Sequence, residues 1–210
     1  MEKIQEVMTL VESGKAKLVP AAVQAALDEG VDASTLLNAM IESMGVVGES
    51  FKNGDIFVPE MLVAAKAMKK GVEVLKPHLT SGEVGSAGTF IMGTVAGDLH
   101  DIGKNLVIMM VESAGFQVID LGVDVPAERF VEAYREYPDT KIIAMSALLT
   151  TTMPAMRDAV ALLNAQSFRS NIKIMVGGAP ITQAFADEIG ADAYTPDAAS
   201  CAQTAKELVS

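Results

Sequence analysis

The strongest constraint on the fold is the alternation of short apolar runs with helical patterns over about the last 120 residues. Each run has the length of a buried strand, and each following segment carries apolar residues at helical spacing. The paired strand and helix ranges are 89–95 and 101–114, 117–121 and 127–137, 141–146 and 152–165, 172–176 and 181–189, and 193–194 and 198–208. Five such units predict a parallel sheet with helices on both faces. Because the crossovers are right-handed, we expect a doubly wound, flavodoxin-like α/β sheet with strand order 2-1-3-4-5.

Residues 1 to about 77 show helical periodicity throughout. Glycine, proline and capping residues divide this region into four amphipathic helices at about 4–14, 19–29, 33–52 and 59–76, the third capped by either Asp32 or Ser34. Four helices joined by short loops predict a small four-helix bundle. The small and polar residues between Pro77 and Thr89 predict a linker. We therefore expect a helical bundle with its linker over 1–85 and an α/β domain over 86–210.

Composition and charge exclude several classes of function. The chain has 16 basic and 27 acidic residues, a net charge of −11, whereas nucleic-acid binding relies on basic patches. No apolar run approaches the ~20 residues of a membrane span, and the N-terminus shows no signal peptide. The single cysteine, Cys201, cannot form an internal disulfide, which fits a reducing cytosol. We expect a cytoplasmic protein with neither nucleic-acid nor membrane partners.

Three loops at predicted strand ends are unusual. They are 97–103 after the first strand, 146–152 after the third and 177–180 after the fourth. In a doubly wound sheet, ligands bind beyond the carboxyl ends of the strands. Because these three strands are neighbours in the predicted order, their loops are expected to line one crevice.

The loop 97–103 permits more than one interpretation. A phosphate-binding loop would need glycine at 98 and serine or threonine at 105, where the chain has Asp98 and Asn105. A metal site is a second interpretation, because Asp98 could orient the ring of His100 as carboxylates orient metal-binding histidines. No second histidine or cysteine lies nearby to complete a zinc site, so a single imidazole suits the axial position of a metal held by a macrocycle. A structural hydrogen bond is the third interpretation of a lone loop histidine.

Sequence motifs in both regions decide between these interpretations. The sequence DLHDIG at 98–103 matches the D-x-H-x-x-G signature of cobalamin-binding domains. The S-x-L element at 146–148 and the paired glycines at 177–178 follow in the expected order. In the helical region, MGVVG at 44–48 and FVPEM at 57–61 are similar to the helical cap of methyl-carrying corrinoid domains. The chain resembles the corrinoid proteins of methanogen and acetogen methyltransferase systems, and the cobalamin-binding part of cobalamin-dependent methionine synthase.

The resemblance implies a role for each matching residue. His100 is the lower axial ligand of cobalt, so that cobalamin binds base-off with its dimethylbenzimidazole displaced. Asp98 holds His100, and the hydroxyl of Thr152 holds Asp98. Ser146 and Thr150 are implied as hydrogen-bond partners of the nucleotide tail, Leu148 packs beside it, and the glycine pair lets backbone approach it. The implied cofactor-binding residues are Gly97, Asp98, Leu99, His100, Asp101, Ile102, Gly103, Ser146, Leu148, Thr150, Gly177, Gly178 and, from the helical cap, Met61.

The same resemblance implies a methyl carrier rather than an autonomous enzyme. Such a subunit accepts a methyl group on cobalt(I) from a substrate-specific methyltransferase, cycling between cob(I)alamin and methylcobalamin. It delivers the group to a second methyltransferase acting on a thiol or tetrahydrofolate, and a reductive activase is a further implied partner. The alternative is a cobalamin-binding sensor, but such sensors carry a tryptophan-containing bundle motif and a DNA-binding region. This chain has no tryptophan and no basic module.

Overall fold

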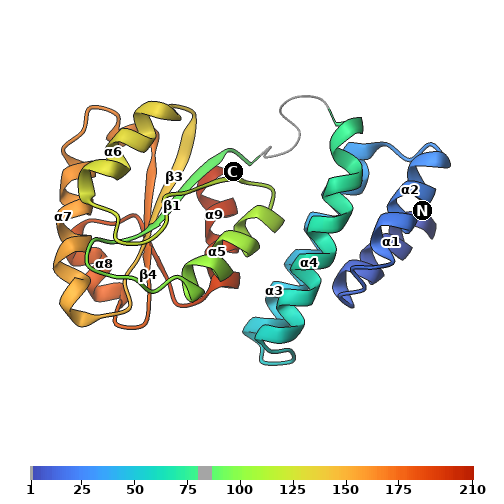
Figure 1. Cartoon of the computed structure of the whole chain (residues 1–210), viewed down its shortest axis with the longest axis horizontal. Helices are drawn as coiled ribbons and strands as arrows, with labels where there is room; N and C mark the ends of the chain where they lie inside the picture. Colours follow the sequence, from blue (N-terminus) through green and yellow to red (C-terminus); the bar gives the residue numbers. More distant parts are fainter. Residues whose placement is uncertain (1, 80–86) are drawn as a thin grey trace. The chain divides into compact units, whose positions relative to one another are not determined.

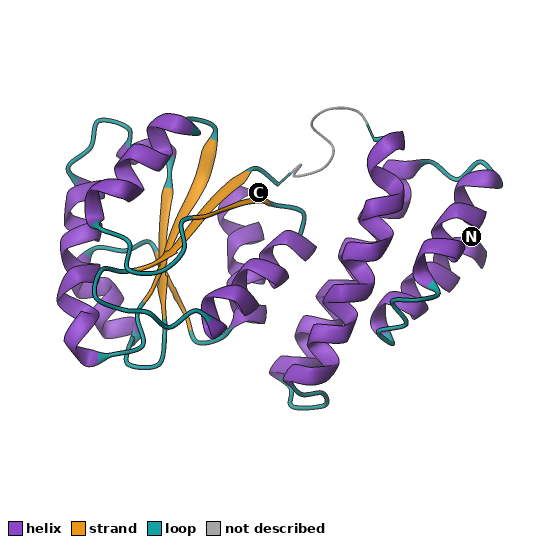
Figure 2. Cartoon of the chain, in the orientation of Figure 1, coloured by secondary structure: helices purple, strands orange, loops and turns teal. Residues whose placement is uncertain are grey.

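The computed structural model describes residues 2–79 and 87–210. The chain divides into two compact units, one made by the N-terminal helices and the other by the sheet and its helices (Figures 1 and 2). Most of the predicted linker falls on residues 80–86, which lie outside the described residues.

The helical unit consists of α1 (Glu2–Glu12), α2 (Val19–Asp28), α3 (Ala33–Lys52) and α4 (Val58–Leu75), followed by the 3-10 turn η1 (Lys76–His78). Asp32 begins α3 by accepting a hydrogen bond from the backbone N–H of Thr35 at 3.0 Å. The prediction of four helices is confirmed, and α4 begins at Val58, one residue before the predicted start. The largest fully buried side chains of this unit are Leu36, Met40, Met61, Met68 and Leu75.

The second unit alternates strands and helices, as predicted. In chain order these are β1 (Thr89–Thr94), α5 (Ile102–Ser113), β2 (Gln117–Asp120), α6 (Ala127–Glu136), β3 (Thr140–Ser146), η2 (Thr150–Thr152), α7 (Met153–Asn164), η3 (Arg169–Asn171), β4 (Lys173–Gly177), α8 (Gln183–Ile189), β5 (Ala193–Thr195) and α9 (Ala198–Val209). All pairings are parallel and the order is β2-β1-β3-β4-β5, which confirms the predicted topology. In Figure 1, α6, α7 and α8 cover one face of the sheet and α5 and α9 the other.

Several predicted helix starts are corrected by one or two residues. The helix predicted from 181 begins at Gln183, because the hydroxyl of Thr182 accepts the backbone N–H of Phe185 and caps it. The helix predicted from 152 begins at Met153, after a 3-10 turn. Within residues 2–79 and 87–210, no helix combines the length and apolar character that crossing a membrane demands.

The register of the central strands sets the position of the loops. Thr94 at the end of β1 pairs with Ser146 at the end of β3, and Ser146 pairs with Gly177 at the end of β4. The three strands therefore end at the same level, and the loops that follow them leave the sheet side by side.

Candidate functional site

Backbone hydrogen bonds join the three strands where each one ends. The N–H of Val95 donates to the carbonyl of Ser146 at 3.0 Å, and the N–H of Ala147 donates to the carbonyl of Gly177 at 3.2 Å. The structure thus brings together the predicted residues of the segments 97–103, 146–152 and 177–178. They meet at the carboxyl edge of the sheet, where ligands of doubly wound folds bind.

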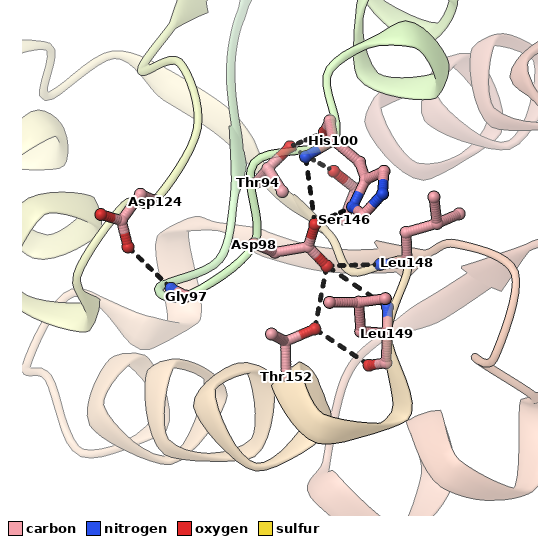
Figure 3. A network of polar contacts seen from close by, with 9 residues as sticks. All are labelled: Thr94, Gly97, Asp98, His100, Asp124, Ser146, Leu148, Leu149 and Thr152. Carbon is pink, nitrogen blue, oxygen red and sulfur yellow. Dashed lines mark hydrogen bonds and ion pairs between the residues drawn. The ribbon is translucent and has the colours of Figure 1, made fainter.

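At the centre of this edge, Asp98 and His100 form a close pair (Figure 3). Asp98 Oδ1 lies 2.7 Å from His100 Nδ1 and accepts the backbone N–H of the same histidine at 3.1 Å. The Asp98 side chain is fully buried, whereas 49% of the His100 side chain is exposed. A buried acid therefore fixes one edge of an imidazole whose other edge is open to a ligand.

The second oxygen of Asp98 is held from the loop after β3. Oδ2 accepts the backbone N–H of Leu148 at 2.7 Å and that of Leu149 at 3.3 Å. It also accepts the hydroxyl of Thr152 at 2.9 Å. The predicted contact between Thr152 and Asp98 is thus present, and two backbone amides donate to the same carboxylate oxygen.

These bonds determine the protonation of the pair. Burial alone would raise the pKa of the Asp98 carboxyl, because the ionised form loses its hydration. Hydrogen bonds from the Leu148 amide, the ring and amide of His100 and the Thr152 hydroxyl outweigh burial and hold the pKa well below its usual range. Asp98 is therefore a carboxylate that only accepts, so His100 Nδ1 carries the proton of the neutral ring. The lone pair of the imidazole then resides on Nε2, as a metal ligand requires.

The hydroxyl of Ser146 has a protein partner in this structure. Ser146 Oγ lies 2.9 Å from Thr94 Oγ1, and Thr94 Oγ1 donates to the backbone carbonyl of His100 at 3.0 Å. The sequence singled out Ser146 as a partner of the nucleotide tail but not Thr94, which supports the backbone of His100. Thr150, the other predicted partner of the tail, is exposed at the start of η2.

The glycines of the site meet different requirements. Gly97 has φ +80°, and its N–H donates to Asp124 Oδ1 at 2.7 Å. Gly178 has φ +125°, and a Cβ there would lie 1.9 Å from the carbonyl oxygen of Ala147. Gly178 is thus needed for the close approach of two protein loops, whatever it does toward a ligand. A Cβ added at Gly103, in the first turn of α5, would meet open space.

Large apolar side chains are exposed in the segments that carry the site. They are Leu99 and Ile102, on either side of His100 in the sequence, and Leu148 and Leu149, whose amides bind Asp98. Several large apolar side chains exposed in the segments of one site are typical of a ligand-binding surface. A ligand with broad apolar faces could cover these side chains while its centre reaches the imidazole.

Asp101 and Met61, two further residues predicted to bind the cofactor, have different surroundings. Asp101 is exposed, and its carbonyl accepts the N–H of Asn105 at the start of α5. Met61 belongs to the helical unit, where it is buried on α4, and its predicted contact with a cofactor stays a prediction.

Sequence reasoning missed the backbone donors of the loop after β3. Leu148 was identified by its side chain, and nothing in residue types reveals where an amide points. The parallel register of β1 and β3 was the only available signal, because it places position 148 opposite the loop that follows β1.

Comparison with known proteins identifies what this site belongs to. A model described as a B12 binding domain matches residues 88–202, and a second model of the same description matches residues 4–76. The chain is 44% identical over 209 residues to dimethylamine corrinoid protein 1 of Methanosarcina acetivorans, covering 99% of this chain and 98% of the relative. The chain belongs to the corrinoid protein family. The resemblance inferred from the motifs is confirmed.

Solved structures support the same assignment for this corrinoid protein. A cobalamin-binding protein from Desulfitobacterium hafniense DCB-2 is similar with a TM-score of 0.84 and 29% identity, covering 99% of this chain and 98% of the other. A chain of the methanol:cobalamin methyltransferase complex MtaBC from Methanosarcina barkeri is similar with a TM-score of 0.85 and 31% identity. That match covers 99% of this chain and 80% of the other.

The residues of the site fit a cobalamin. Among residues 2–79 and 87–210, no group of three or more histidine, cysteine, aspartate or glutamate side chains could hold a metal ion. The site instead offers one oriented imidazole next to exposed apolar side chains. A metal whose remaining positions come from a macrocycle needs one such ligand from the protein.

Proposed function

We propose that this corrinoid protein binds cobalamin base-off through His100 Nε2 and carries methyl groups between two methyltransferases. The observation that carries the proposal is the half-exposed His100 ring, whose Nδ1 is fixed by a buried carboxylate at 2.7 Å. Such an arrangement sets the tautomer and the direction of a metal-binding imidazole.

The residues around His100 divide the work of holding the ring. Asp98 keeps the proton on Nδ1 and so keeps Nε2 as the donor atom. The amides of Leu148 and Leu149 and the hydroxyl of Thr152 keep Asp98 ionised and aimed at the ring. Exposed apolar side chains of the loops exclude water from the metal-facing side of the imidazole when a ligand covers them.

Cobalamin, when bound, supplies a cobalt centre that accepts a methyl group from a donor and passes it to an acceptor. The partners proposed are a substrate-specific methyltransferase, a second methyltransferase for a thiol or tetrahydrofolate, and a reductive activase. Dimethylamine and methanol, the donors named for the relatives, are the first substrates to test with matching methyltransferases.

Ligation by His100 is tested by isotopic labelling. The protein is produced with 15N-histidine, loaded with hydroxocobalamin, desalted and reduced to cobalt(II) for EPR spectroscopy. We expect the colour to remain with the protein, and the nitrogen splitting to change from a triplet to a doublet on labelling. His100→Ala should remove the doublet, while His78→Ala, at the other histidine of the chain, should retain it.

Two results would contradict the proposal. A colourless protein after desalting would reject cobalamin binding. A triplet that persists in the labelled wild type would show that the cofactor keeps its own nitrogen base, and would reject His100 as the ligand.

A further inference from the structure

Lys104 is a buried cation close to the site that has no assigned role. It lies in the first turn of α5, four residues after His100, and its side chain is only 3% exposed. Its ammonium donates to both carboxylate oxygens of Asp120, each at 2.8 Å, and to Asn105 Oδ1 at 2.8 Å. All three hydrogen-bonding positions of the ammonium are thus accounted for.

A lysine in this place is difficult to explain by stability alone. Burying an ammonium costs hydration energy, and a positive charge at a helix N-terminus opposes the helix dipole. Its partner Asp120 is 43% exposed, so a methionine at 104 would leave that carboxylate in contact with water. An apolar residue of similar volume would fill the same space at no greater cost. What the lysine adds is a fixed, directional connection between α5 and the end of β2.

That connection reaches His100 through the start of α5. Lys104 binds the side-chain oxygen of Asn105, and the backbone N–H of Asn105 donates to the carbonyl of Asp101 at 2.8 Å. Asp101 follows His100 directly in the chain. Hydrogen bonds therefore connect Lys104 to the start of the helix and to the residue after His100.

A second path reaches His100 through the ends of β2 and β1. Asp120 Oδ1 accepts the N–H of Gly122 at 2.8 Å, and the carbonyl of Gly122 accepts the N–H of Thr94 at 3.0 Å. The hydroxyl of Thr94 in turn donates to the carbonyl of His100. Lys104 and Asp120 thus close a ring of hydrogen bonds that passes through the backbone carbonyls of His100 and Asp101.

We propose that Lys104, with Asp120, is a positioning residue for His100: the pair anchors the start of α5 to β2 and so fixes the backbone that carries the imidazole. Its effect on a bound metal rests on the function proposed above. Its effect on the loop is a property of the protein without cofactor and is tested there first.

The first experiment uses Lys104→Met and measures amide hydrogen exchange by NMR in the cofactor-free protein. The reporters are the amides of His100 and Leu148, which both donate to Asp98. We expect their exchange to accelerate about tenfold or more, because the anchored loop opens more often. Lys173→Met is the matched control and should leave both amides unchanged. Lys173 is exposed at the start of β4, so it lies at the amino-terminal ends of the strands, away from the carboxyl ends that carry the site.

Asp120→Asn guards against loss of folding in Lys104→Met. It changes a half-exposed side chain and keeps one carbonyl acceptor for the ammonium, so a smaller acceleration of the same two amides is expected. Folding of the sheet unit is checked by tyrosine fluorescence, because Tyr134, Tyr137 and Tyr194 all lie there. Folded variants at both positions with exchange within about twofold of wild type would overturn the proposal.

A second experiment separates this proposal from the proposed function. In protein loaded with cobalamin and reduced to cobalt(II), Lys104→Met should lower the fraction of molecules showing histidine nitrogen splitting, and Lys173→Met should not. If wild type shows no such splitting, the proposed function fails, and the exchange of the His100 amide still decides the role of Lys104. If wild type shows the splitting and Lys104→Met retains all of it, positioning by Lys104 is rejected while ligation by His100 stands.

Discussion

The two units of the molecule differ in where their buried polar side chains find hydrogen-bond partners. Among the described residues of α1 to α4, Ser43 is the one buried polar side chain, and it bonds to the carbonyl of Ala39 in its own helix. In the sheet unit, Asp98 is bound by Thr152 from 54 positions away, and Lys104 by Asp120 from 16 positions away. The helical unit is thus specified by local pattern, whereas the site depends on which strands lie side by side.

The largest expected effect is on the alkylation rate of Cys201, which lies in the sheet unit. Burial raises the pKa of the Cys201 thiol to about 12. At pH 8 the native thiol should therefore react with iodoacetamide roughly a thousandfold more slowly than in the urea-unfolded chain, where the pKa is about 8.5. Mass spectrometry against time measures both rates, and Cys201→Ser gives the background. Similar rates in native and unfolded protein would show that this part of the sheet unit is open.

Glycine substitutions compare close packing in the two units. Gly178→Ala places a Cβ against the carbonyl oxygen of Ala147 at a positive φ, and rigid backbone cannot yield. We expect the sheet unit to lose about 3 kcal/mol or more of unfolding free energy. Gly71→Ala places a Cβ 2.2 Å from the terminal methyl of Met40 and 2.9 Å from Val19 Cγ1. Both neighbours are side-chain atoms that can shift, so the helical unit should lose about 1–2 kcal/mol.

Urea unfolding followed by tyrosine fluorescence and by far-UV circular dichroism measures these two losses. Gly103→Ala is the control, since open space surrounds that glycine and alanine favours helix. An equal or greater loss for Gly71→Ala would remove the distinction between backbone and side-chain neighbours.

Asp98→Asn tests how far the site depends on a carboxylate. One oxygen accepts two donors from His100, and the other accepts the amides of Leu148 and Leu149. An asparagine must aim its NH2 at one of these sets, so the sheet unit should lose about 2–4 kcal/mol. Asp158→Asn, on the exposed side of α7, should change the unfolding midpoint little. An Asp98→Asn protein as stable as the control would mean that the groups donating to Asp98 can bind water instead, with no loss of unfolding free energy.

These differences explain how much could be predicted from the sequence. The four helices were placed within one or two residues, because apolar spacing, Pro20 and capping residues are local signals, and the structure decides for Asp32 over Ser34 as the cap of α3. The strand order followed from the alternation of elements and the handedness of crossovers. The contacts of Asp98 with His100 and Thr152 followed from the family motifs.

The rest depended on directions that residue types do not encode. The amides of Leu148 and Leu149 and the hydroxyl of Thr94 act through backbone geometry set by the register of β1 and β3. Gly178 has a further reason that the sequence did not reveal, because a Cβ there would meet the carbonyl oxygen of Ala147.

The smallest expected losses of stability follow from removing one buried hydroxyl in each unit. The Thr152 hydroxyl lies 2.9 Å from both Asp98 Oδ2 and the carbonyl of Leu149, and has one proton for these two acceptors. Thr152→Val leaves Asp98 with its backbone donors, so the loss should be about 1 kcal/mol, well below that of Asp98→Asn. Ser43→Ala should change stability by less than about 0.5 kcal/mol, since the carbonyl of Ala39 retains its place in the helix and alanine favours helix.

Urea midpoints for these two variants, measured with the probes used for the glycines, decide the point. A loss for Thr152→Val as large as that for Asp98→Asn would make the hydroxyl, rather than the amides of Leu148 and Leu149, the main support of the carboxylate. A loss for Ser43→Ala equal to that for Thr152→Val would mean that a hydroxyl bonded within its own helix matters as much as one that joins two distant loops. Either result would contradict the contrast, for buried hydroxyls, between a hydrogen bond within one helix and a hydrogen bond that joins distant segments.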